Sequence, residues 1–140
     1  MQPRYMAEVF RMKVIVCGSR EWNNEWCRTL VDNELERLIK SNDEMFVIHG
    51  GCSKGADRFA SEWCKRTLPH VFAYEKVYVA DWDKEGKKAG LVRNQQMADD
   101  GADLCLAFWN GTSKGTEYMI KAAAQAGIIV KIIPAPRYNP

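Results

Sequence analysis

The stretch MFVIHGGCSKGAD, residues 45–57, passes from an apolar strand through a glycine-rich loop toward a helix that should begin near Gly55. A short apolar run that ends at glycine is typical of a buried parallel strand. Comparable runs predict four further strands, at residues 13–17, 77–80, 104–109 and 128–133. Helical spacing of apolar residues predicts further helices, at residues 26–39, 93–98 and 115–126. This alternation predicts an α/β fold, a Rossmann-like three-layer sandwich in which helices cover both faces of a mostly parallel five-stranded sheet.

The composition is that of an ordinary globular protein, with 46% hydrophobic and 27% charged residues in 140. This length corresponds to one domain. We predict that residues 13–133 form the domain, with an N-terminal extension at 1–12. The proline-rich end PAPRYNP, residues 134–140, is predicted to be a C-terminal tail, because proline cannot continue a sheet.

Charge and cysteine content exclude several classes of protein. A net charge of +2, from 20 basic and 18 acidic residues, argues against a strongly polycationic nucleic-acid binder. The five cysteines form no CxxC pair, so we predict no metal site and reduced thiols in a cytoplasmic protein. No apolar run approaches the ~20 residues of a membrane span, and the segment MQPRYMAEVFRM has no apolar signal-peptide core.

Three predicted strand-to-helix loops carry the same residue types. Right-handed crossovers place these loops at one edge of the sheet, where open α/β sheets bind ligands. Glycine for close backbone approach, hydroxyl groups and helix N-termini are the requirements of a phosphate cradle. The residues concerned are Gly18, Ser19 and Arg20 after the first strand, Gly50, Gly51, Ser53, Lys54, Gly55 and Asp57 after the second, and Gly111, Thr112, Ser113, Gly115 and Thr116 after the fourth. The alternative is that these residues only shape turns and cap helices. Neither a Walker A nor a G-x-G-x-x-G motif is present, and we expect no cofactor.

Further polar and aromatic residues are candidates for ligand contacts. Arg20 and Arg93 are expected to neutralise phosphate charge. Asn94 either forms hydrogen bonds to a base edge or caps a helix. Asp57 either binds a ribose hydroxyl or, as a carboxylate in the first turn of a helix, interacts favourably with the helix dipole. Asp81 and Trp82 follow the third strand, so the ring either stacks on a base or packs at the rim.

The remaining aromatic, histidine and cysteine residues have mainly structural interpretations. Trp26 and Trp63 fall on helix faces and are predicted to be core residues. His49, at a strand end, is more readily explained as a packed, hydrogen-bonded histidine than as a general base. Cys52 lies beside a helix N-terminus, which would favour its thiolate. Asn23 or Asn24 is the predicted N-cap of the first helix.

Four blocks together resemble a known family: VIVCGSR at 14–20, VIHGGCSKGAD at 47–57, VADWDKEGKKAGLVRNQQMADDGAD at 79–103 and GTSKGTEYMIKAAAQAGIIV at 111–130. They resemble the YspA-type, cpYpsA-related branch of the SLOG superfamily, over about residues 13–133. That superfamily also contains the Lonely Guy phosphoribohydrolases and the DNA-processing protein A fold. The resemblance implies a Rossmann-like sheet, a pocket for a nucleotide or nucleotide-derived ligand, and a homo-oligomer, commonly a dimer.

The similarity to the Lonely Guy enzymes, which cleave the N-glycosidic bond of nucleoside monophosphates, is partial. Gly18-Ser19 matches their early glycine-serine pair, and Arg93 to Met97 matches part of their R-K-x-x-M segment. Their P-G-G-x-G-T-x-x-E motif is matched only at Gly115-Thr116, and its glutamate falls on Met119. Methionine cannot stabilise the transition state or steer water. If the protein is an enzyme, Arg93 and Glu117 are therefore the catalytic candidates.

Three functions agree with these patterns to different degrees. The first is a ligand-binding or sensing module for a nucleotide-type small molecule. The alternative is a Lonely Guy-like phosphoribohydrolase. The second alternative, binding of single-stranded nucleic acid, is the weakest because it calls for a basic stripe that a net charge of +2 does not favour.

Overall fold

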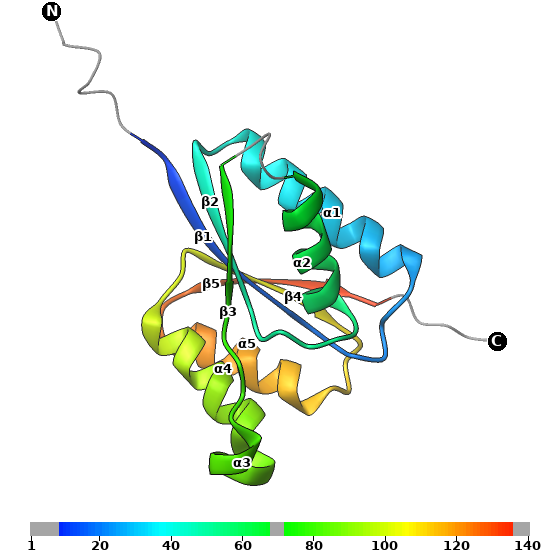
Figure 1. Cartoon of the computed structure of the whole chain (residues 1–140), viewed down its shortest axis with the longest axis vertical. Coiled ribbons are helices and arrows are strands. Elements are labelled where there is room, and N and C mark those ends of the chain that lie inside the picture. Colours follow the sequence, from blue (N-terminus) through cyan, green and yellow to red (C-terminus); the bar gives the residue numbers. More distant parts are fainter. Residues whose placement is uncertain (1–8, 68–71, 136–140) are drawn as a thin grey trace, which may run out of the picture.

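Five strands form one parallel sheet in the order β3-β2-β1-β4-β5 (Figure 1). The structure is a computed structural model and describes residues 9–67 and 72–135. The strands are β1 (Arg11–Gly18), β2 (Glu44–His49), β3 (Ala73–Val77), β4 (Leu104–Trp109) and β5 (Ile129–Pro134). All four strand pairs are parallel. The chain runs outward from β1 through β2 to β3 and then crosses to β4, so the topological switch point lies between β1 and β4.

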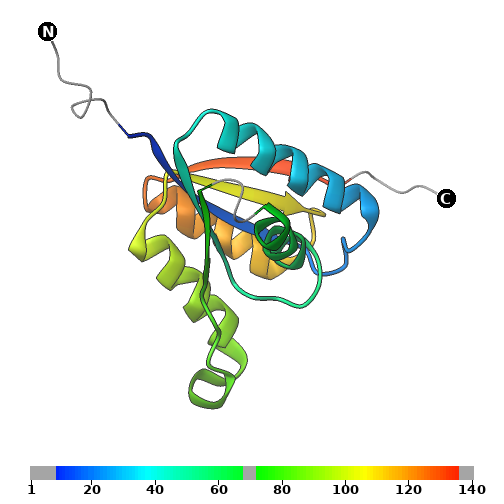
Figure 2. The same ribbon diagram turned by 45° about the horizontal axis from the view of Figure 1, so that its top comes forward.

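Helices cover both faces of this sheet, which confirms the predicted three-layer α/β fold. One layer contains α1 (Glu25–Lys40) and α2 (Ala56–Thr67), and the other contains α4 (Ala89–Asp100) and α5 (Lys114–Gln125). Figure 2 shows the two layers on opposite sides of the strands. The short helix α3 (Trp82–Glu85) and the 3₁₀ turn η2 (Gly86–Lys88) precede α4 and project from the body of the molecule (Figure 1).

The apolar core lies in two parts, one on each face of the sheet. Val14 and Val16 of β1 pack with residues of α1 and α2, whereas Ile15 packs with residues of α4 and α5. All three side chains are fully buried. This continuous burial explains why β1 is apolar throughout its centre, as expected for a strand covered on both faces.

Local capping signals mark the start of α1, as predicted, and the end of α5. Asn24 is the N-cap of α1, where its side chain accepts a hydrogen bond from the N–H of Cys27 at 3.0 Å. Gly127 follows α5 with a φ of +79°, a conformation that glycine adopts without strain. Both signals act locally along the chain, so the sequence is sufficient to find them.

The sheet extends slightly beyond both predicted limits of the domain, residues 13 and 133. β1 begins at Arg11, which pairs with Glu44, so residues 11 and 12 are part of the sheet rather than of an extension. Pro134 is the last residue of β5 and lies opposite Trp109. A proline is tolerated there because β5 is an edge strand.

The third strand and the loop after it also differ from the prediction. β3 covers Ala73–Val77, and the chain leaves the sheet after the N–H of Tyr78 donates to the carbonyl of His49 at 2.9 Å. The β-branched pattern at 77–80 is therefore misleading, because Val79 is largely exposed. The helix predicted at residues 93–98 begins four residues earlier, as α4 starts at Ala89.

The two helical tryptophans have opposite environments. Trp63 is buried in the core, as predicted, but Trp26 is 60% exposed. The buried stripe of α1 runs through Cys27, Val31 and Leu35, at helical spacing. Trp26 is about 100° away from Cys27 around the helix axis, so it faces outward.

The described residues carry neither a metal cluster nor a membrane span. Among them, no three His, Cys, Asp or Glu side chains gather as a metal-binding group. No helix in residues 9–67 and 72–135 combines the length and hydropathy needed to cross a bilayer. The five cysteines are all free thiols.

Candidate functional site

Ser19 joins the loop after β1 to the loop after β4. Its N–H donates to the carbonyl of Phe108 at 3.1 Å, and its Oγ accepts from the N–H of Asn110 at 3.1 Å. The preceding Gly18 is equally confined, because a Cβ there would lie 2.8 Å from the Phe108 carbonyl and 2.9 Å from the Cβ of Ala56. The predicted convergence of the first and fourth loops is therefore present, with Ser19 almost completely buried between them.

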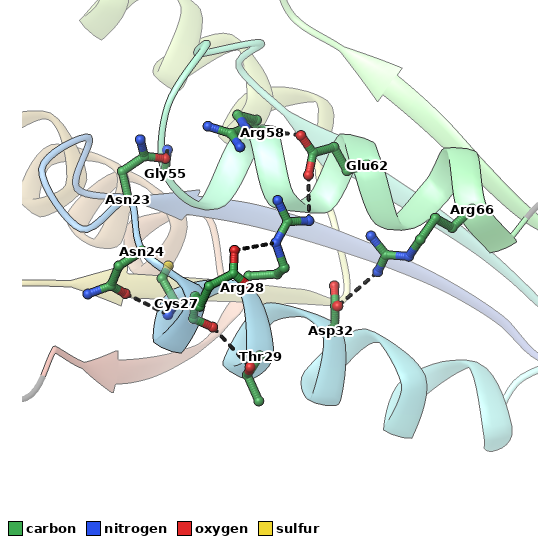
Figure 3. A network of polar contacts seen from close by, with 11 residues as sticks. Asn23, Asn24, Cys27, Arg28, Thr29, Asp32, Gly55, Arg58, Glu62 and Arg66 are labelled. Atoms are coloured by element: carbon green, nitrogen blue, oxygen red, sulfur yellow. Dashed lines mark hydrogen bonds and ion pairs between the residues drawn. The ribbon is translucent and has the colours of Figure 1, made fainter.

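Gly55 joins the loop after β2 to the same place. Its φ is +79°, and a Cβ at this position would lie 2.8 Å from the carbonyl oxygen of Ser19. Its N–H donates to Oδ1 of Asn23 at 2.8 Å, a contact that Figure 3 shows at the start of α2. Only glycine satisfies both the backbone conformation and the close approach. The three glycine loops thus meet over the carboxyl ends of β1, β2 and β4.

Ion pairs between α1 and α2 hold the N-terminal half of α2 in place (Figure 3). Glu62 accepts from Arg28 of α1 at 2.5 Å and from Arg58 of its own helix at 3.0 Å. These contacts, with that of Arg58 the larger, lower the pKa of Glu62 below its ordinary value. Both guanidinium groups also lie over the ring of Phe59, at 4.7 and 5.2 Å from its centroid.

The loop after β4 uses much of its own hydrogen-bonding capacity. Oδ1 of Asn110 accepts from the N–H groups of Thr112 and Ser113, both at 2.9 Å. Ser113 is the N-cap of α5 and accepts from the N–H of Thr116, while its carbonyl accepts from Nε1 of Trp109. At these positions the structure shows the turn and capping contacts that the alternative interpretation requires. The sequence analysis missed Asn110, although an asparagine followed by glycine after a strand is a known turn signal.

The loop after β2 and the first turn of α2 leave more of their backbone N–H groups without an acceptor. The N–H of Gly51 donates to Nδ1 of His49 at 3.0 Å, and the N–H of Cys52 donates to Oδ2 of Asp57 at 3.2 Å. The N–H groups of residues 56–58, in the first turn of α2, donate to no acceptor within the described part of the chain. Ser53 and Lys54 are exposed beside them. A free first turn of this kind favours an anion.

Both ring nitrogens of His49 are engaged, which confirms the packed-histidine interpretation. Nε2 lies 2.6 Å from Oε2 of Glu75, while Nδ1 accepts from Gly51. Because Nδ1 accepts a hydrogen bond, Nε2 is the nitrogen that carries the hydrogen, and it donates a hydrogen bond to the Glu75 carboxylate. The ring is only 2% exposed, so it offers no free nitrogen to a ligand.

Asp57 is the buried carboxyl group of the site. It is 7% exposed, and burial raises its pKa above the ordinary value, although His49, Cys52 and Arg93 act in the opposite direction. The prediction that Cys52 favours a thiolate is wrong. Burial, followed by the nearby charge of Asp57, raises the pKa of the Cys52 thiol.

Arg93 connects the loop after β2 to α4. Its Nη1 donates to the carbonyls of Gly50 at 2.5 Å and Tyr78 at 3.4 Å, and its Nε donates to Oδ1 of Asn94 at 2.8 Å. A Cβ on Gly50 would lie 2.3 Å from Nη1, so the guanidinium occupies the space that glycine leaves. Nη2 makes no hydrogen bond to the described residues and remains available to an anion.

Asn94 links α4 to the start of α5. It is 8% exposed, and its Nδ2 donates to the carbonyl of Gly115 at 3.2 Å. Its Oδ1 already accepts from Arg93. Asn94 therefore positions Arg93 against α5, a role that sequence analysis did not anticipate because the contact spans two helices.

Trp82 lies beside Arg93 at the outer end of the site. The Cη2 atom of Trp82 and Nη2 of Arg93 are each 3.7 Å from the point that a Cβ on Gly90 would occupy. The indole is 55% exposed and borders an open hollow of about 510 Å³ lined by residues 79–83. Asp81 is the N-cap of α3, where its Oδ1 accepts from the N–H of Lys84 at 3.1 Å. Capping by Asp81 orients the helix that carries the ring.

α5 supplies the site with no free carboxylate, either from the catalytic candidate Glu117 or from position 119, where the family glutamate falls. Glu117 lies at the surface and pairs with Lys121 at 3.0 Å and Lys114 at 3.6 Å. Lys121, and to a lesser extent Lys114, lowers the pKa of Glu117. Met119 is fully buried among the core residues of its face.

A second hollow, of about 360 Å³, lies between α2 and β3, where Arg58, Ser61 and Glu75 are among its lining residues. Neither this hollow nor the one beside Trp82 is lined by residues 18–20 or 111–117. The second glycine loop, through Gly51 and Cys52, borders the hollow between α2 and β3. The open flanks of the loop junction are the start of α2 and the Arg93–Trp82 side.

Comparison with known proteins agrees with this architecture. Residues 12–84 match the model of the YspA, cpYpsA-related SLOG family. The chain is also similar to the Gene 61 protein of Mycobacterium phage D29, with 39% identity over 119 residues that cover 84% of this chain and 93% of that protein. The match to the family model includes the first two glycine loops, Asp57 and Trp82. On this evidence the chain belongs to the YspA, cpYpsA-related SLOG family.

Proposed function

We propose that this protein binds a nucleotide or nucleotide-derived small molecule at the carboxyl edge of its sheet, as a ligand-binding or sensing module. The observation that carries the proposal is the junction of the loops at Ser19, Gly55 and Asn110, with Arg93 anchored on its flank. Ligands of open α/β sheets bind at this edge. Membership of the SLOG family supports a nucleotide-related ligand.

The phosphate is proposed to bind at the start of α2. The free N–H groups of residues 56–58 and the exposed side chains of Arg20 and Lys54 supply donors and positive charge. Nη2 of Arg93 supplies a further donor. The fourth loop contributes less than the sequence pattern suggested, because the protein's own oxygens occupy the amides of Thr112 and Ser113.

The base is proposed to lie against Trp82. Its exposed indole next to Arg93 offers an aromatic face at one end of the same flank. Stacking of a base on such a ring contributes about 1–3 kcal/mol in nucleic-acid complexes. A ligand that spans from α2 to Trp82 therefore has a charged end and an aromatic end.

A thermal-shift panel of nucleotides tests this proposal. A ligand at ~100 times its Kd stabilises the folded state by about 2.7 kcal/mol. We expect at least one nucleotide to raise Tm, and Lys54→Ala and Trp82→Ala to reduce the shift. Lys40→Ala, at the opposite end of α1, is the matched control and retains the full shift. Absence of a shift with every nucleotide would refute the proposal.

A phosphoribohydrolase is the second candidate, and Asp57 is the observation that favours it. Cleavage of a riboside needs a carboxyl group that can exchange a proton, and a raised pKa suits that role. Asp57 meets this requirement in place of the surface-paired Glu117. Chromatography of nucleoside monophosphates after incubation tests the idea, and intact substrate in a mixture that shows binding excludes it.

A further inference from the structure

We infer that Asp57 binds a sugar hydroxyl of the ligand, so that the site selects phosphorylated ribosides over phosphates that lack this hydroxyl. The inference rests on the proposed function and deepens it. It assigns to one buried carboxylate a specificity that neither the family match nor the viral relative states.

The position of Asp57 is the first observation. It lies in the first turn of α2 and is close enough to Cys17, His49 and Arg93 for its charge to interact with each of them. These residues come from the ends of β1 and β2 and from α4. Asp57 therefore sits between the proposed phosphate site at the start of α2 and the Arg93–Trp82 flank.

The unused acceptor capacity of Asp57 is the second observation. A carboxylate has about four lone-pair positions. Within the described residues, its hydrogen-bond partner is Cys52, whose N–H donates to Oδ2 at 3.2 Å and whose thiol interacts with the same carboxylate. The residue is 7% exposed, and its Oδ1 is not among the fully buried side-chain atoms that lack a partner.

Most of the neighbouring donors are already engaged elsewhere, and the free Nη2 of Arg93 is assigned above to the phosphate. The His49 ring donates to Glu75, and Nη1 and Nε of Arg93 donate to backbone and Asn94 oxygens. Burying a carboxylate with so few partners is unfavourable for the fold. A donor from a ligand would use this capacity.

The chemistry of that donor follows from the surroundings. A carboxylate repels phosphate, so the part of the ligand that contacts Asp57 must be uncharged or positive and must carry a hydrogen. In a nucleotide, the ribose hydroxyls lie between the phosphate and the base. Dinucleotide-binding sheets of the Rossmann type, which differ from this chain in their glycine motif, use an acidic residue to bind a ribose hydroxyl. A ribose hydroxyl is the donor that this position favours.

Calorimetry with paired ligands tests the inference. The probes are AMP, GMP, CMP and UMP, each compared with its 2′,3′-dideoxy analogue. The proteins are the wild type, Asp57→Ala, Asp57→Asn and the control Asp99→Ala, an exposed residue of α4 that bonds Gln95. Asp57→Asn keeps an oxygen for the Cys52 N–H, so it remains informative if Asp57→Ala does not fold.

We expect the ratio of the affinity for a ribonucleotide to the affinity for its dideoxy analogue to depend on Asp57. Wild type and Asp99→Ala bind the ribonucleotide about tenfold to a hundredfold more tightly than its dideoxy analogue, the range for a hydrogen bond to a charged group. In Asp57→Ala this ratio falls to about one, and in Asp57→Asn it falls part of the way. The affinity for the dideoxy analogue stays close to the wild-type value.

Three other results would count against the inference or the proposal beneath it. Equal binding of both members of every pair by wild type overturns the hydroxyl contact and leaves the proposed function intact. So does an Asp57→Ala variant that weakens both members equally, because that pattern shows a structural role. Failure of wild type to bind any of the eight probes overturns the proposed function and the inference with it.

Discussion

Replacing Gly50 with alanine tests how Arg93 is held in the site. The backbone at Gly50 does not require glycine, since its φ lies outside the left-handed region. The added Cβ would lie 2.3 Å from Nη1 and 2.5 Å from Cζ of Arg93. The guanidinium must therefore move away, and it loses its hydrogen bonds to the carbonyls of Gly50 and Tyr78.

The expected change in stability follows from two opposing effects. A hydrogen bond to a charged group contributes about 1.5–3 kcal/mol, and the half-buried position of Arg93 reduces this value. Alanine restricts the unfolded chain and adds about 0.4–1 kcal/mol of stability. We expect Gly50→Ala to lower the free energy of unfolding by about 1 kcal/mol, or Tm by roughly 4 °C for a chain of this length.

Urea denaturation of a double-mutant cycle is the assay. In an Arg93→Ala background the obstruction is gone, so Gly50→Ala should become neutral or stabilising by about 0.4–1 kcal/mol. Gly115→Ala is the matched control, because a Cβ there meets nothing within 4 Å, and it should stabilise the start of α5. Equal effects of Gly50→Ala with and without Arg93 would refute the reasoning.

Three further substitutions address single residues of the site and its scaffold. Burial raises the pKa of Asp57, so the folded state loses stability as pH rises through the folded-state pKa. Asp57→Asn should therefore be more stable than wild type near neutral pH, but not in acid below the unfolded-state pKa. Urea denaturation across this pH range checks the sign of the effect. Glu117→Gln should leave nucleotide binding and any turnover unchanged, because surface lysines hold the Glu117 carboxylate. Weaker binding in calorimetry, or slower turnover in chromatography, would show that Glu117 contacts the ligand. Asn24→Ala removes the N-cap of α1 and should cost about 1 kcal/mol in urea denaturation, and no change would show that the bond to Cys27 is not stabilising.

The parallel sheet and its order of elements could be predicted because the deciding signals are local. Apolar runs followed by glycine-containing loops predicted β4 at its observed bounds, β2 with one residue missing, and β1 as residues 13–17 of the observed 11–18. β3 could not be found in the same way. Its sequence AYEKV is polar, and it is a strand because it pairs with β2, whereas the more β-like VYVA that follows is largely outside the sheet.

The site was predictable in its location but not in its contacts. Parallel topology requires the loops after β1, β2 and β4 to share an edge, and their glycines marked where backbones approach closely. The bond from Arg93 to the Gly50 carbonyl joins residues 43 positions apart, and the bond from Asn110 to Ser19 joins residues 91 positions apart. No local pattern encodes such pairs. For the same reason, the sequence could not show that Asn110 already occupies the amides of the fourth loop.

Asp57 is the residue of the site whose burial is hardest to explain by packing alone, although its place in the first turn of α2 and its bond to the N–H of Cys52 also serve the fold. Apolar or small residues fill the other positions where α2 faces the sheet, among them Ala56, Phe59 and Ala60. Asp57 lies between them as a buried carboxylate with one backbone hydrogen bond, and its burial opposes ionisation. Natural proteins keep such unfavourable groups mainly where a ligand or a reaction uses them. If Asp57→Asn stabilises the protein and abolishes the preference for ribose, the two measurements together will identify this carboxylate as a functional group that the fold tolerates.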